Sequence, residues 1–260
     1  MTAWLPSRKT RVPVRTLIWH DPRVSGSHYE THVTVRCDSA AESERLRCWA
    51  AGAGLKLTHI VLARGRMPSQ SMVTLTGSPS YAAESARARE VAAHLRADGF
   101  VPVRVKIESS PWAPEVPREP CGADGDERYF EHHVKLLLDA DTDLDALAAK
   151  VVAHGAHLSW NARRVRASEI DGSGGTGGRH ERFVTQRCRG VDAEGAGRLL
   201  ELLLAELYGF EVADVEREFV LHDSDLSVDD GWIEEAGARV SRGAPVAQTQ
   251  IPRATEEVLG

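Results

Sequence analysis

The feature that most constrains this chain is a strand-like pattern that occurs twice. Residues 29–33 and 130–134 both read aromatic, Glu, any residue, His, Val, and they lie 101 positions apart (29 to 130). Apolar and polar residues alternate in each copy, which is typical of a strand with one buried face. A potential capping residue and an Ala- or Leu-rich stretch follow each strand, and the stretches end at Gly54 and Gly155. We therefore expect one structural unit in two diverged copies.

Further signals extend both copies in the same order. Strands are predicted around residues 57–59 and 72–77 in the first copy, and around 158–160 and 183–188 in the second. A second helix begins near Ser78 or Asp192 and leads to a last strand at 103–108 or 213–219. The order β-α-β-β-α-β is that of the ferredoxin-like motif. The predicted fold is therefore α+β, with tandem duplicated ferredoxin-like units and antiparallel sheets.

Proline and charge patterns divide the chain further. A stretch with four prolines separates the two units and cannot join a central strand. The expected parts are an N-terminal segment that can add an edge strand (1–27), the first ferredoxin-like unit (28–110), a Pro-rich linker (111–127), the second unit (128–222), an acidic loop with a Trp anchor (223–235) and a disordered tail (236–260).

Composition limits the partners. The 38 acidic and 32 basic side chains give a net charge of −6, without the basic excess typical of nucleic-acid-binding proteins. No apolar stretch approaches the roughly 20 residues of a membrane span, and the start of the chain is too polar for a signal-peptide core. The four cysteines form no CxxC pair. We expect a cytoplasmic protein whose partner is a small molecule rather than nucleic acid or membrane, and the sequence does not identify a cofactor.

The polar faces of the two opening strands supply the candidate site. Residues two apart on a strand share a face, so the polar residues lie opposite Val33 and Val134. A carboxylate beside a histidine favours its protonated form and orients it as a base. The candidate catalytic residues are His32, His133, Glu30 and Glu131. The candidate ligand-binding residues are Thr34, Lys106, Glu108, Lys135, Glu216, Glu218, Asp223 and Asp225.

Three functional interpretations follow. The leading one is a small-molecule enzyme or binding protein with a Glu- and His-lined cleft between the two units, suited to acid–base chemistry on a polar or phosphate-ester ligand. The alternative is a non-catalytic partner-binding or regulatory module that uses residues 65–70 and the tail. An RNA-processing protein is a third interpretation, disfavoured by the acidic charge and by the lack of an aromatic–basic strand signature.

Two short residue patterns offer further interpretations. Residues 32–35, His-Val-Thr-Val, resemble the His–hydrophobic–Thr–hydrophobic signature of two-histidine phosphoesterases, but the second copy has Lys135 where the Thr belongs, and no residue role is taken from this short match. A metal ion is conceivable at alternate strand residues drawn from Glu30, His32, His59, Glu131, His133 and His222. Because eleven histidines make chance clusters frequent, no metal site is predicted.

Overall fold

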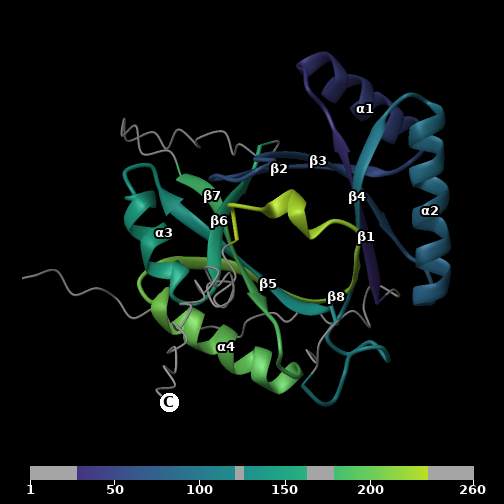
Figure 1. Ribbon diagram of the computed structural model, residues 1–260. Coiled ribbons are helices and arrows are strands. Elements are labelled where there is room, and N and C mark those ends of the chain that lie inside the picture. The colour runs from purple at the N-terminus through teal and green to yellow at the C-terminus, as the bar shows by residue number, and fades with distance from the viewer. Residues whose placement is uncertain (1–27, 121–125, 163–178, 234–260) are drawn as a thin grey trace, which may run out of the picture.

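The computed structural model describes residues 28–120, 126–162 and 179–233. Eight strands, four α-helices and a 3-10 helix lie within these ranges (Figure 1). In chain order they are β1 (Tyr29–Arg36), α1 (Ala40–Gly52), β2 (Lys56–Leu62), β3 (Ser69–Thr76), α2 (Tyr81–Ala97), β4 (Val101–Ser109), β5 (Tyr129–Asp139), α3 (Leu144–Val152), β6 (Ala156–Asn161), β7 (Arg179–Cys188), α4 (Ala193–Glu206), β8 (Glu211–Asp223) and η2 (Leu226–Asp229).

The eight strands close into one antiparallel barrel. Their order is β1-β3-β2-β6-β7-β5-β8-β4, and β4 pairs back with β1. Two pairings complete the ring: β2 meets β6, with Val61 opposite Trp160, and β4 meets β8, with Lys106 opposite Asp223. The prediction of duplicated ferredoxin-like units, each with its own open sheet, is therefore wrong. The edge strands of the two predicted units hydrogen-bond to each other, which removes the unpaired edges.

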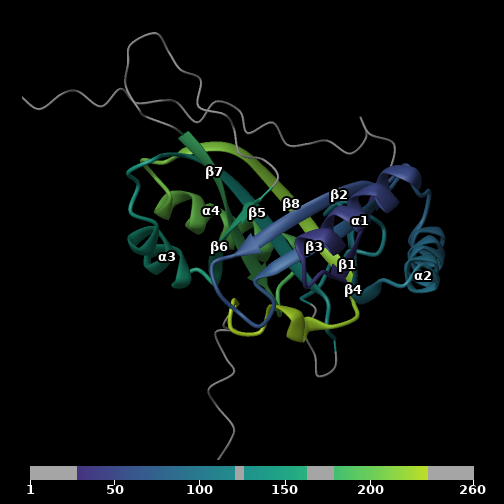
Figure 2. The same ribbon diagram turned by 90° about the horizontal axis from the view of Figure 1, so that it is seen from above.

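The apolar core lies outside the barrel, between its wall and the helices. Helices α1 and α2 cover one side and α3 and α4 cover the other (Figures 1 and 2). On the first side, Val33 and Val35 of β1 pack in a buried cluster with Leu46 and Leu95 of the helices. The matching cluster on the second side includes Val134, Leu136, Leu147, Leu200 and Leu203. Since apolar side chains of each strand point outward to the helices, their polar neighbours point into the barrel.

Each α-helix begins at a side chain that accepts a hydrogen bond from the first turn. Ser39, Ser80, Asp143 and Asp192 each accept from the backbone N–H three residues further on. The start of the second helix was expected near Ser78, but α2 begins after Ser80, whose hydroxyl accepts from the Ala83 N–H at 3.2 Å.

The segment after β8 lies across one end of the barrel. Figure 1 shows η2 in front of the barrel opening, and Figure 2 shows it at one end of the strands. Trp232 is buried, and its indole N–H donates to the Leu158 carbonyl at 3.0 Å. The backbone N–H of Arg66, in the turn between β2 and β3, donates to the Asp230 carbonyl at 2.7 Å. We call residues 224–233 the plug.

Several sequence predictions concern residues that the structure does not describe. The edge strand expected within 1–27 and the tail expected from 236 lie outside the described residues, as does the Gly-rich run at 172–178, which lengthens the second predicted unit relative to the first in the sequence. Within the described residues, no helix combines the length and the apolar character needed to cross a bilayer.

Candidate functional site

The interior of the barrel contains a cavity of about 590 Å³, and all eight strands contribute to its lining. Most of the lining side chains are polar or charged. The cause is the period-two alternation described above, which directs the apolar residues to the helices. Lys56, Thr76 and Glu216 are exposed members of the lining, so the cavity communicates with solvent.

Ten of the twelve predicted site residues line this cavity. They are Glu30, His32, Thr34, Lys106, Glu108, Glu131, His133, Lys135, Glu216 and Glu218. The other two belong to the plug and its approach rather than to the cavity lining. Asp223 pairs with Arg104, and Asp225 accepts from the Ser227 N–H at 3.0 Å. The residues expected in a cleft between two sheets thus meet inside one barrel.

His32 joins three strands. Its Nδ1 lies 3.1 Å from the hydroxyl of Thr74 on β3, the residue directly opposite it. Its Nε2 lies 3.2 Å from a Glu108 oxygen on β4 and 3.5 Å from Glu30. Burial disfavours the charged imidazole, but the Glu108 carboxylate outweighs it and raises the pKa of His32 above its usual value.

His133 on β5 has similar surroundings. Its Nδ1 lies 3.0 Å from the hydroxyl of Thr185 on β7, and its Nε2 lies 3.2 Å from a Glu218 oxygen on β8. Burial opposes protonation, yet Glu218 raises the pKa of His133 to about 9. Burial, with Glu108 nearby, raises the pKa of Glu218 to about 7. The pair therefore holds at least one proton near neutral pH.

A lysine and two carboxylates lie between the histidines. Lys106 Nζ is 2.6 Å from Glu108 and 3.1 Å from Glu131. Burial disfavours the ammonium, but these two carboxylates hold the pKa of Lys106 well above its usual range. Glu108, His133 and Glu218 each offer one atom able to bind a metal, and the three atoms lie within 4.8 Å of one another. The centre of the barrel thus combines proton-carrying groups with potential metal ligands.

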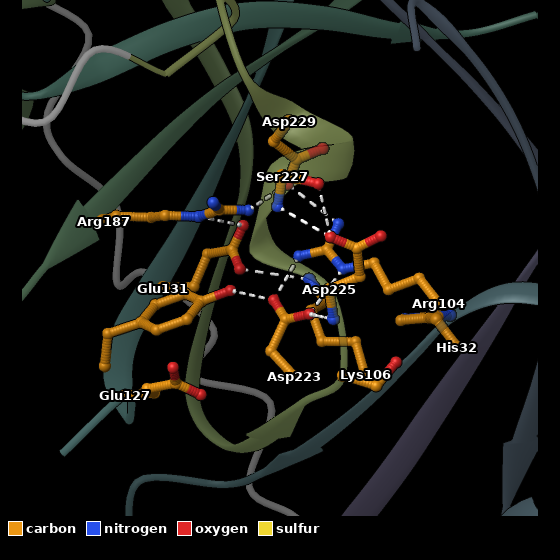
Figure 3. A network of polar contacts seen from close by, with 12 residues as sticks. His32, Arg104, Lys106, Glu127, Glu131, Arg187, Asp223, Asp225, Ser227 and Asp229 are labelled. Atoms are coloured by element: carbon orange, nitrogen blue, oxygen red, sulfur yellow. Dashed lines mark hydrogen bonds and ion pairs between the residues drawn. The ribbon is translucent and has the colours of Figure 1, made fainter. Parts of the chain in front are cut away.

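A second buried network joins the wall of the barrel to the plug (Figure 3). Arg104 donates to Asp223 and, at 2.8 Å, to Asp229 of η2, which also pairs with Arg187 at 2.5 Å. Tyr129 donates its hydroxyl to Asp223 at 2.9 Å. Burial alone would favour protonation of Asp229, but Arg187 and Arg104 hold the pKa of this carboxyl well below its usual range.

Sequence reasoning missed Thr74, Thr185, Arg104 and Arg187. Arg104 could have been predicted from the sequence, because it lies two residues before Lys106 on the same strand and period two puts both on one face. The two threonines contact the histidines only through the β1–β3 and β5–β7 registers, which no local pattern specifies. Arg187 likewise lies opposite Glu131 across the β5–β7 pairing.

Comparisons with known proteins add little. A scan against protein-family models and a search of the curated proteins found no match. Among solved structures, the chain is similar to one described as a dye-decolorizing protein from V. cholerae, with 11% identity over 75% of this chain and 93% of that chain, and a TM-score of 0.23. A likeness of this extent identifies neither fold nor function.

Proposed function

We propose that the protein binds a small polar molecule inside the barrel and that His32 and His133 contact it. The observation that carries the proposal is the convergence of both histidines and their glutamates on one cavity of about 590 Å³. A volume of this size falls within the range of small-molecule sites. Polar groups directed into it from opposite walls match a ligand with several hydrogen-bonding atoms.

The energetics of the interior support a binding role. Buried ion pairs such as Lys106 with Glu108 contribute little net stability, because the loss of hydration offsets the Coulombic attraction. Apolar side chains of the same volume would fill a barrel of eight strands at least as well. Folding stability therefore does not account for the charged lumen, whereas ligand binding would.

The same geometry is suited to chemistry on the bound molecule. Each histidine has a carboxylate within 3.2 Å of Nε2 and a threonine hydroxyl that fixes its ring through Nδ1. A histidine oriented by a hydroxyl and a carboxylate can act as a general acid or base once an atom of the bound molecule replaces one of these two contacts. Acid–base catalysis on the lumenal molecule is thus the reaction that we propose for an enzymatic form of this function.

The partner-binding alternative has less support. Its expected surface, residues 65–70, is occupied within the chain, because Gln70 donates to Asp229 at 2.8 Å and the Arg66 N–H donates to Asp230. A cytoplasmic location completes the proposal, since Cys37, Cys48 and Cys188 are free thiols, as is usual in a reducing compartment.

The test is a thermal-shift screen of the full chain against metabolites and nucleotides. A ligand is expected to raise the Tm of the wild type, and His32→Ala and His133→Ala are expected to lose this response. His94→Ala on the exposed face of α2 is the matched control and should keep it. A ligand whose stabilisation survives in both lumenal variants would refute the proposed site.

A further inference from the structure

Three potential ligand residues meet at the centre of the barrel from neighbouring strands. Glu108 lies on β4, Glu218 on β8 and His133 on β5, and these strands are adjacent in the order β5-β8-β4. The β4–β8 register shifts between Ile107 and Glu108, so that Glu108 pairs with Val220. Irregularities of this kind re-aim side chains and are frequent beside functional sites. The strands thus bring one imidazole and two carboxylates to one place.

The two ring nitrogens of His133 have the kinds of partner that are found around a metal-binding histidine. Such a ligand uses one nitrogen for the ion, and the other nitrogen bonds an oxygen that fixes the ring. Thr185 takes the Nδ1 side at 3.0 Å, which leaves Nε2 facing Glu218 at 3.2 Å. Two ligands of a tetrahedral ion with bonds of 2.0–2.1 Å are separated by about 3.3 Å. Nε2 and the Glu218 oxygen therefore already have the spacing of two ligands on one ion.

Glu108 is held in place from its other side. Its carboxylate is buried, and neither oxygen makes a well-oriented hydrogen bond within the described residues, although Lys106 lies at 2.6 Å and His32 at 3.2 Å. These two neighbours are ion-pair contacts that can persist while one oxygen turns to an ion. His32, bonded in turn to Thr74, acts here as a positioning residue for Glu108.

Charge favours a cation at this point. Glu30, Glu108, Glu131 and Glu218 belong to the central group, and Lys106 is the fixed positive charge that contacts it most closely. Arg187 reaches Glu131 only at 3.6 Å and is shared with Asp229. Metal binding requires His133 without its proton, and in that state the four carboxylates outnumber the nearby positive charges, so a divalent ion would offset most of the excess.

We propose that Glu108, His133 and Glu218 bind one divalent transition-metal ion. A set of imidazole and carboxylate ligands suits Zn²⁺ or Mn²⁺, and three protein ligands leave coordination positions for water or an oxygen of a bound molecule, as in catalytic sites. The inference rests on the proposed function in that the ion would hold the lumenal molecule. Metal binding itself needs no second ligand and is measured separately.

The experiment uses the full chain, freed of metal with a chelator and titrated with Zn²⁺ and Mn²⁺ by calorimetry, with bound metal counted by elemental analysis after gel filtration. The wild type is expected to bind one ion per chain. Thr185→Val retains every ligand but loses the hydroxyl that fixes His133, and should weaken binding by roughly 10- to 100-fold. Glu218→Gln and His133→Ala should weaken it further.

The control is His154→Ala, which removes a histidine in the turn after α3, 3.8 Å from the Glu206 carboxylate of α4, and should leave affinity and stoichiometry unchanged. Circular dichroism establishes whether each variant is folded. If a ligand variant does not fold, the metal affinity of Thr185→Val tests the inference in its place. Absence of stoichiometric binding by the wild type overturns the inference, as does wild-type affinity in folded His133→Ala and Glu218→Gln. If no ion binds but His32→Ala still abolishes a ligand response, the lumenal site stands without a metal.

Discussion

Arg104 and Asp229 are 125 positions apart in the sequence, and their side chains form an ion pair of 2.8 Å inside the barrel. Asp229 also accepts from Arg187 and Gln70, so strands β4, β7 and β3 all hold the same carboxylate. Both Arg104 and Asp229 are almost fully buried. The plug is therefore fixed to the wall of the barrel by charge as well as by Trp232, and it closes one end of the lumen.

The first prediction concerns this carboxylate. Asp229→Asn keeps the shape of the side chain but removes the charge that compensates two buried arginines, and breaking a buried pair in this way costs about 3–5 kcal/mol. Urea denaturation should show a loss of that order at neutral pH. Asp230→Asn, at the exposed neighbouring position, should change the free energy of unfolding by less than about 0.5 kcal/mol. Equal effects of the two changes would contradict the role given to Asp229.

The second prediction is the pH dependence of the same contact. The pKa of Asp229 is lower in the folded protein than in the unfolded chain, so its stabilising contribution is complete above the unfolded pKa of about 3.9. The contribution is lost as pH falls through the folded value. The difference in Tm between wild type and Asp229→Asn should therefore be constant from neutral pH to about pH 5 and should shrink below about pH 4. A difference that grows in acid would exclude this linkage.

How far the fold follows from the sequence depends on the range of the interactions. Alternation along one strand assigned Glu30, His32 and Thr34 to the polar face, because period two is a local property. The closure of the barrel depends on β2–β6 and β4–β8, which join residues about 100 or more positions apart, such as Val61 with Trp160. No local pattern distinguishes an edge strand that pairs from one that stays free. The open-sheet prediction failed at that step.

The same distinction between local and long-range interactions applies to the candidate site. His32 and His133 were selected from their own strands, yet their partners Thr74 and Thr185 depend on cross-strand register. Asp223 was selected as a ligand-binding residue from its acidic loop, and its ion pair with Arg104 also depends on the β4–β8 pairing. An acidic loop with a tryptophan has many possible docking positions, and tertiary contacts with buried arginines decide between them. Residue type and face were thus predictable, whereas pairing was not.

The third prediction tests the seat of the plug. A Cβ atom at Gly65, where φ is +118°, would lie 3.0 Å from both Cβ and the backbone nitrogen of Trp232. Gly65→Ala should therefore displace Trp232, lower the Tm and shift the tryptophan fluorescence towards that of an exposed indole. Gly77→Ala is the control, because φ is +96° there and a Cβ would meet nothing within 4 Å. If both variants lose the same stability, backbone strain alone explains the effect and the close approach to Trp232 is unimportant.

The last prediction measures the charge coupling at the centre of the barrel. Lys106→Met has a similar volume but leaves Glu108 and Glu131 without their lysine, which should cost about 3–5 kcal/mol in urea denaturation under metal-free conditions. Adding Glu131→Gln to the same chain removes one of the two carboxylate charges that Lys106→Met leaves unpaired. The double variant should therefore be less destabilised than the sum of the single changes, with a coupling energy on the order of 1–3 kcal/mol.

Lys150 and Glu206 provide a matched cycle on the outer helices, where both side chains are partly exposed to solvent. Lys150→Met and Glu206→Gln should couple by less than about 1 kcal/mol, because water and salt screen an exposed pair. The contrast between the two cycles separates a buried network from an ordinary surface ion pair. Additive effects at Lys106 and Glu131 would mean that solvent screens the lumen as it does the surface. That result would exclude the weakly screened interior on which the proposed ligand and metal binding depend.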